Sequence, residues 1–221
     1  MRLSRVLVLP VLVPALLSAC SSGPNFVAQY EPWRDQEESA CIASGVLQRT
    51  TYLTSRSALG GPGVCGTERP YEVTAVDDGR VRIKPAALLR CPMIPQIERW
   101  IREHVSPAAV YHFGAEVEEI TTAGSYNCRP INHKSGGKLS EHGYANALDV
   151  SGFVLSNGQR ISLVRHWNGN HAERAFLRAA QRGACQHFTT VLGPEYNRAH
   201  RDHFHVDLAR RGRDGLGRVC K

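Results

Sequence analysis

The sequence has no internal repeat, no low-complexity tract and no feature that would mark a second domain. It also lacks the stripe of interleaved aromatic and basic residues that is typical of proteins that bind nucleic acid. No two cysteines have the Cys-x-x-Cys spacing of a structural metal site. These absences favour a single globular domain, and about 200 residues are enough for one domain with a sizeable core.

The start of the chain has the pattern of a bacterial secretion signal. Arg2 and Arg5 precede an apolar run over residues 6–16, and small residues then lead to Cys20. The run is too short to span a membrane as a helix. The sequence therefore predicts that the mature protein is exported, which also argues against nucleic acid as a partner.

The segment Leu17-Ser18-Ala19-Cys20 resembles a lipobox. It predicts that residues 1–19 are a lipoprotein signal peptide, that Cys20 is lipidated, and that Ser21 directs the protein to the outer membrane of a Gram-negative bacterium. Ordinary secretion with an unmodified Cys20 is the alternative. Residues 20–38 are polar and contain Gly and Pro, so we expect a tether before a domain at 39–221.

The formal net charge is +7, and removal of the two leader arginines lowers it by two. A modest cationic excess on a periplasmic protein suits an anionic partner, such as a cell-wall polymer or a membrane surface.

Six cysteines follow the leader, an even number that predicts about three disulfides in an exported protein. Pairing of sequence neighbours would join 41–65, 91–128 and 185–220, although other pairings are possible. The six are Cys41, Cys65, Cys91, Cys128, Cys185 and Cys220.

Hydrophobic spacing predicts an α+β fold in which helices flank a small, largely antiparallel sheet. We expect helices at 41–52, 92–104 and 172–182, the last ending at Gly183. A hairpin at 71–83 turns at Asp77-Asp78-Gly79. Further strands are expected at 117–120, 147–153, 161–166, 187–192 and 204–208.

Two segments carry candidate metal ligands. From His203 to Leu208 the chain alternates strictly, so His203, His205 and Asp207 would share one face of a strand. Imidazoles two residues apart on a strand are separated by about 6–7 Å, close enough to converge on one site. The segment 140–149 adds His142 and Asp149, and His, Asp and His would form a zinc site with one position open to water.

The pattern Ser-x-His-(x)6-Asp followed by His-x-His resembles that of zinc peptidases that cleave D-amino-acid peptides of peptidoglycan. These include D-Ala-D-Ala carboxypeptidases and penicillin-insensitive murein endopeptidases, and the Hedgehog signalling domain shares their fold. From Cys41 to Cys220 the chain more closely resembles the extensin-like C-terminal domain family, although it has no Pro-rich extensin repeat. The matching segments are 124–129, 140–142, 147–153, 191–194 and 202–205.

The resemblance implies that His142, Asp149 and His205 bind Zn²⁺. It also implies that His203 contacts the oxyanion or the attacking water. A rival assignment makes His203 the ligand in place of His205.

The general base is less well defined. Dipeptidase-type relatives carry Glu where this chain has Asp202, and the Asp side chain is one methylene shorter. If Asp202 is not the base, we expect it to be a loop residue paired with Arg198 or Arg201. Endopeptidase-type relatives instead have His-x-x-His-x-His, matched here by His200, His203 and His205, so His200 or His203 would accept the proton.

Other residues in the matching segments have expected roles in binding or positioning. Arg129 resembles the family arginine that binds a substrate carbonyl or carboxylate. Ser140 would contact substrate or form a turn. Asp207 would orient a ligating histidine.

The leading hypothesis is a periplasmic zinc metallopeptidase of carboxypeptidase or endopeptidase type that acts on peptidoglycan peptides. The alternative is a metal-containing module that binds cell-wall peptides without cleaving them. A disulfide-braced envelope protein without metal would leave the histidine cluster unexplained.

Overall fold

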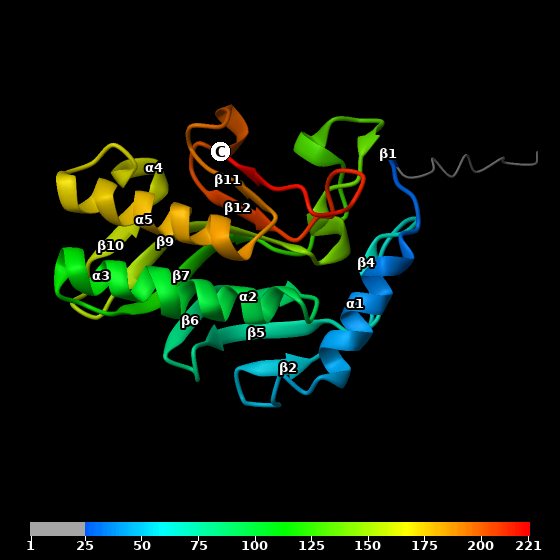
Figure 1. Ribbon diagram of the computed structural model, residues 1–221, viewed down its shortest axis with the longest axis horizontal. Helices are drawn as coiled ribbons and strands as arrows, with labels where there is room; N and C mark the ends of the chain where they lie inside the picture. Colours follow the sequence, from blue (N-terminus) through cyan, green and yellow to red (C-terminus); the bar gives the residue numbers. More distant parts are fainter. Residues whose placement is uncertain (1–24) are drawn as a thin grey trace, which may run out of the picture.

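The computed structural model describes residues 25–221, so the expected signal peptide at 1–19 and the lipidation site at Cys20 lie outside the described residues. The fold is α+β, built around a nine-stranded sheet with helices against it (Figure 1). The helices are α1 (Pro32–Ala43), α2 (Met93–Trp100), α3 (Ser106–Phe113), α4 (Leu163–His166) and α5 (His171–His187), and the shorter turns are η1 (Ile101–Val105), η2 (Ile131–His133), η3 (Glu141–Tyr144) and η4 (Arg198–His200). No helix among residues 25–221 is both long and apolar enough to cross a membrane.

The main sheet has the order β13-β11-β12-β9-β7-β6-β5-β2, with β10 paired to β9. Its strands are β2 (Leu53–Ser55), β5 (Tyr71–Val76), β6 (Val81–Leu89), β7 (Val117–Gly124), β9 (Ala147–Leu155), β10 (Arg160–Ser162), β11 (Thr190–Leu192), β12 (Phe204–Asp207) and β13 (Val219–Cys220). Two short pairs lie outside it, and they join β1 (Phe26–Val27) to β8 (Gly137–Lys138) and β3 (Leu59–Gly60) to β4 (Gly66–Thr67).

The sheet is larger than expected and mixed: most of its strand pairs are antiparallel, but two are parallel. β6 pairs with β7 in parallel, and so does β11 with β13. The α2–η1–α3 segment lies between β6 and β7 in the chain, and a helical crossover of this kind returns the chain in a parallel direction. The hairpin at 71–83 is confirmed as β5–β6, with Asp77 and Asp78 both in the left-handed region at φ 54°.

The helices differ from expectation at their ends. The helix expected at 92–104 continues through the π-helical turn η1 to Phe113. Pro107, which has no N–H to donate, follows η1 in the first turn of α3. The helix expected to end at Gly183 runs on to His187. The strand expected at 161–166 ends at Ser162, where α4 begins.

The N-terminal expectation also needs correction. The helix expected at 41–52 is α1, which begins earlier at Pro32 and ends at Ala43. Residues 32–38 therefore belong to a helix rather than to a tether, and Arg34 and Glu38 on that helix are buried. Proline is well tolerated in the first turn of a helix, which explains the start at Pro32.

Three disulfides brace the described residues, as expected, but two of the three expected pairings are wrong. The bonds are Cys41–Cys91, Cys65–Cys128 and Cys185–Cys220. Cys41 lies on α1, so its bond to Cys91, just before α2, fastens this N-terminal helix to the core of the fold.

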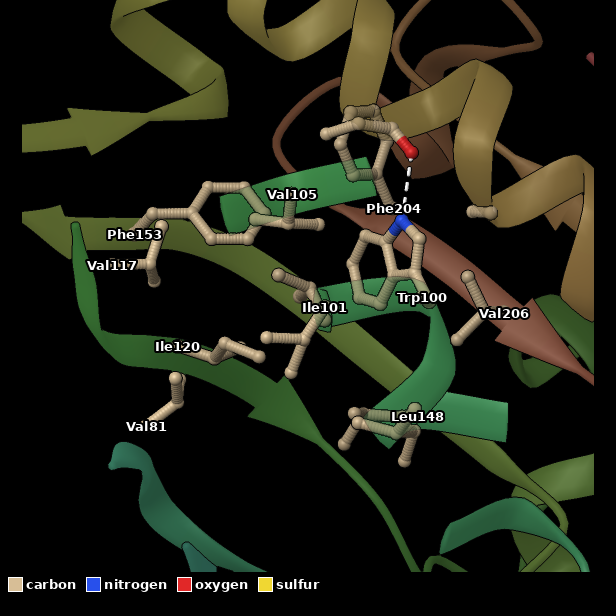
Figure 2. Packing of buried hydrophobic residues seen from close by; sticks show 14 of the residues in the cluster. Val81, Trp100, Ile101, Val105, Val117, Ile120, Leu148, Phe153, Phe204 and Val206 are labelled. Carbon is tan, nitrogen blue, oxygen red and sulfur yellow. Dashed lines mark hydrogen bonds between the residues drawn. The ribbon is translucent and has the colours of Figure 1, made fainter. Parts of the chain in front are cut away.

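The helices α2, α3 and α5 lie together over one face of the sheet (Figure 1). Between them and the sheet, Trp100 is completely buried, and its indole N–H donates to the Ala180 carbonyl at 2.8 Å. Its ring makes edge contacts with Phe153 and Phe188, at centroid distances of 6.2 and 6.0 Å. Figure 2 shows this ring beside Val206, with Leu148 and Phe204 in the same cluster.

Replacement of Trp100 by alanine is expected to destabilise the fold by about 3–5 kcal/mol, because it leaves a large cavity in the core. Urea unfolding followed by circular dichroism measures this loss. Tyr111→Ala is the control, since Tyr111 is 83% exposed and its loss should change stability by no more than about 0.5 kcal/mol. Equal midpoints for the two variants would contradict the assignment of Trp100 to the core.

Candidate metal centre

Two neighbouring strands bring Asp149 and His205 together. β9 and β12 are antiparallel, and His205 is the direct register partner of Asp149. Their neighbours Leu148, Val150 and Val206 belong to the core beneath the helices. Because side chains alternate along a strand, His205 and Asp149 point to the opposite face, which these helices leave uncovered.

His142 joins this pair from the turn η3. Its Nε2 lies 3.1 Å from Asp149 Oδ2 and 3.1 Å from His205 Nδ1, and His205 Nδ1 lies 3.0 Å from Asp149 Oδ1. All three residues are buried. Ligand atoms bound about 2.0–2.1 Å from a tetrahedral zinc lie about 3.3 Å apart, so this spacing and donor set fit the ion. The identity of the metal as zinc stays a prediction.

The second nitrogen of each imidazole has an acceptor that fixes the ring. His142 Nδ1 is hydrogen-bonded to the Ser125 carbonyl, and His205 Nε2 lies 3.0 Å from Asp207 Oδ2. Asp207 in turn accepts the Ala209 backbone N–H at 2.9 Å. Ligating histidines in metalloproteins are held in this way, which leaves the other nitrogen free to bind the metal.

In the metal-free protein, the pKa values of Asp149 and His205 are shifted in opposite directions. Burial would raise the pKa of Asp149, but hydrogen bonds from His142 and His205 hold it well below its usual range. Burial would lower the pKa of His205, but its hydrogen bonds to Asp149 and Asp207 raise the pKa to about 9. Without metal, His205 is therefore an imidazolium between two carboxylates at neutral pH.

This charge state predicts a pH dependence of stability. A raised pKa stabilises the fold below the ordinary value of 6.5, and the contribution is lost as the pH rises through about 9. The melting temperature of chelator-treated protein should fall as the pH rises from 6.5 to about 9. His205→Gln should not show this decrease. The zinc-loaded protein should also lack it, because the ligand nitrogen is then unprotonated. Identical slopes for wild type and His205→Gln would contradict this charge state.

Contacts from a distant helix hold η3 in place. Arg34 on α1 binds both carboxylate oxygens of Glu141, at 2.7 and 2.8 Å. The amide of Asn146 donates to the same carboxylate at 2.6 Å. The Arg34 guanidinium also lies 3.8 Å from the centroid of the Tyr144 ring. Since Glu141 and Tyr144 flank His142, α1 helps to position a candidate ligand.

His203 lies beside the cluster but outside it. Its Nε2 is 3.6 Å from Asp149 Oδ1, and its Nδ1 is bonded to Asp202 Oδ1 at 2.9 Å. The Asp202 side chain is 59% exposed and pairs with this histidine rather than with Arg198 or Arg201. An imidazole held by a carboxylate at one nitrogen can accept a proton at the other.

His200 is the third histidine at the site. It is buried, its Nδ1 lies 2.8 Å from Asn197 Oδ1, and its ring centroid is 5.2 Å from that of His203. Burial, followed by repulsion from His203 and His205, lowers the pKa of His200 to about 4. It is therefore neutral and a weak base at neutral pH.

Two clefts meet at the cluster. The larger, of about 830 Å³, is lined by His142, His205 and His200, together with Arg129 and Ser140. The smaller, of about 570 Å³, is lined by Asp202 and two arginines, Arg160 and Arg165. Asp149 and His203 line both clefts.

The structure brings every residue expected to bind metal, contact substrate or transfer a proton to these clefts, where each has different surroundings. Arg129 is half-buried and bonded only weakly, to the Pro130 carbonyl at 3.4 Å, so its guanidinium can bind another partner. Ser140 is buried and accepts the His142 backbone N–H, which makes it the N-cap of η3. Of the two roles expected for Ser140, the turn-forming one is observed.

Some supporting groups were not found from the sequence. The Ser125 carbonyl belongs to the backbone and has no side-chain signature. Asn197 precedes His200 by three residues, a spacing that suggests a turn but not a partner for an imidazole. Arg34 lies in a segment expected to be a tether, so its bond to Glu141 could not be anticipated.

Comparison with protein families identifies a match over most of the chain. Residues 39–221 match the family described as Extensin-like protein C-terminus. Because the match covers most of the chain, this protein belongs to that family. No curated protein and no solved structure matches it.

Proposed function

We propose that this member of the extensin-like C-terminal family is a periplasmic zinc metallopeptidase that hydrolyses peptidoglycan stem peptides or their crosslinks. We also propose kinship with the D-Ala-D-Ala carboxypeptidases and murein endopeptidases. The observation that carries the proposal is the convergence of His142, Asp149 and His205, with both imidazoles fixed through their second nitrogens. A structural role alone does not explain why three buried polar side chains converge at the junction of two clefts.

In this proposal His142 Nε2, His205 Nδ1 and an Asp149 oxygen hold the ion. When bound, zinc supplies a Lewis acid for a peptide carbonyl and lowers the pKa of a bound water. His203, oriented by Asp202, holds a nitrogen close to Asp149, where it can accept a proton from the nucleophile. His200 is the weaker candidate for this role, given its pKa of about 4.

The clefts favour substrates that extend on both sides of the scissile bond. Because Asp149 and His203 line both clefts, a peptide can lie across the cluster with residues in each. Arg129 on one side and Arg160 and Arg165 on the other would pair with the carboxylates of stem peptides. This arrangement supports an endopeptidase acting on crosslinked chains more than a carboxypeptidase that removes one terminal residue.

The alternative, a non-catalytic module that binds cell-wall peptides, has one observation in its favour. The Asp202 carboxylate is mostly exposed and bonded to His203, so this expected acidic base does not contact the cluster directly. Export, lipidation at Cys20 and attachment to the outer membrane remain part of the proposal on the sequence pattern alone.

Digestion of purified muropeptides tests the proposal. Full-length protein with added zinc is incubated with crosslinked dimers and with monomers, and products are identified by mass spectrometry. We expect cleavage of dimers that stops with chelator and returns when zinc is restored. Zinc binding and saturable muropeptide binding without any cleavage would instead establish the non-catalytic module.

A further inference from the structure

A second cluster of metal-binding side chains lies away from the clefts. Among residues 25–221, Glu103, His104 and His187 form the other group whose ligand atoms all lie within 4.8 Å of one another. Glu103 and His104 come from η1, and His187 is the last residue of α5. None of the three lines either cleft at the candidate metal centre.

The two elements are shaped to bring these side chains together. η1 is a π-helical turn, and such turns are rare and often occur at functional sites. Opposite it, Gly183 lies inside α5, and a Cβ at this position would come within 2.3 Å of the His104 Cβ. The glycine, which costs helix stability, therefore allows His104 to pack directly against α5. The His104 and His187 rings are 5.2 Å apart, centre to centre.

His187 has an unused donor or acceptor atom at this position. Its side chain is only 10% exposed, and its Nε2 is buried without a hydrogen-bond partner. The nearest carboxylate oxygen, Glu103 Oε2, is 3.4 Å away. Burial lowers the pKa of His187, which favours the neutral imidazole that metals bind. A buried nitrogen without a partner costs free energy, so a missing ligand is a physical explanation for it.

Some charges near this cluster favour a bound cation and others oppose it. His187 ends α5, and the carboxyl end of a helix attracts a cation. Arg99 and Arg218 oppose a cation nearby, since both act to lower the pKa of His187. Arg218 is already bonded to the carbonyls of Cys185 and Gln186 at the end of α5. We therefore expect binding to be weaker than at the buried cluster in the cleft.

An ion pair between Glu103 and a protonated His187 is the simpler interpretation, but it fits less well. The lowered pKa disfavours the charged imidazole, and the pair does not reach hydrogen-bond geometry. An ion pair also does not explain why His104 packs so closely against α5 at Gly183. Two imidazoles and a carboxylate are instead the donor set that zinc prefers.

We propose that Glu103, His104 and His187 form a second zinc site, which fastens α5 to η1 and is separate from the site in the cleft. The Glu103 side chain is 47% exposed, so the remaining coordination position is open to water. Zinc bound only by the folded state stabilises it by mass action.

Zinc titration of the metal-free, full-length protein, followed by calorimetry, tests this site. We expect two equivalents of zinc for the wild type and one for His187→Gln or His104→Gln. His205→Ala should lose the other equivalent, so failure at one site is distinguished from failure at the other. The matched control is His112→Gln, a histidine on the adjoining helix α3 outside the cluster, which should keep both equivalents.

Glu103→Gln keeps the test informative if the histidine variants fail to fold, because the Glu103 side chain is half-exposed and its replacement disturbs the fold less. It should weaken only the second equivalent, by at least about tenfold. A zinc-edge anomalous difference map should also show a peak between the His104 and His187 rings. Wild-type stoichiometry that no change at Glu103, His104 or His187 alters would overturn the proposal.

Discussion

His142→Ala is expected to remove zinc from the cleft and to abolish muropeptide hydrolysis while the protein remains folded. The change takes away one of three ligand atoms and leaves His205 and Asp149 to pair with each other. Loss of a ligand should weaken zinc binding by more than the about 10–100-fold that follows loss of an outer hydrogen-bond partner. The Ser140 cap and the Arg34–Glu141 pair act on other atoms of η3, so the turn itself should persist.

Zinc content by elemental analysis and initial rates on crosslinked muropeptides measure the two effects. His171→Ala is the matched control, because His171 is an exposed histidine at the start of α5, and it should change neither. If His142→Ala kept wild-type zinc content and activity, the assignment of the ligands would be lost.

His203→Ala is expected to have a different combination of effects: the rate falls, as it does for His142→Ala, but zinc stays bound. A positioned acid or base contributes about 10²–10⁴-fold to a rate, so kcat should fall in that range. His203 Nε2 lies next to Asp149 but is not among the three converging ligand atoms. Substrate binding should change less than kcat, since Arg129 and the other residues that line the clefts are unchanged.

Two variants separate the candidates for the base. Asp202→Asn should lower kcat by a smaller factor, because it removes only the group that orients His203. His200→Ala should also have the smaller effect, because a histidine with a pKa of about 4 is a poor base at neutral pH. A larger loss for His200→Ala than for His203→Ala would reverse the assignment. Loss of zinc from His203→Ala would favour the rival ligand set.

Local patterns in the sequence predicted the elements that carry the site. Strict alternation after His203 identified β12 and the face shared by His205 and Asp207. The turn residues Asp77, Asp78 and Gly79 identified the β5–β6 hairpin, because they tolerate positive φ. The alternation of apolar residues and the identity of turn residues depend only on neighbours in the sequence, so both can be recognised before the fold is known.

Contacts between distant segments were not predictable in the same way. The register that sets His205 opposite Asp149 depends on how β9 and β12 pair, and nothing local specifies it. The disulfides of Cys41 and Cys65 cross 50 and 63 residues, so pairing by proximity in sequence failed for them. Gly183 was expected to end a helix, but its actual constraint is His104 on another segment.

The mixed sheet, by contrast, was within reach of sequence reasoning. A helix was expected between the hairpin and the strand at 117–120, and such a crossover implies that the flanking strands are parallel. The antiparallel expectation was drawn from the overall order of helices and strands and did not use this crossover. The order of elements around 92–104 was the more informative signal.

The claim that two imidazoles and one carboxylate share a single ion can be tested most directly by X-ray absorption at the zinc edge. The sample is full-length His187→Gln protein loaded with one equivalent of zinc, so that only the cleft site contributes. We predict two histidine nitrogens and a carboxylate oxygen at about 2.0–2.2 Å, with one further oxygen from water. A spectrum without imidazole scattering, or a protein that retains no zinc, would contradict the account.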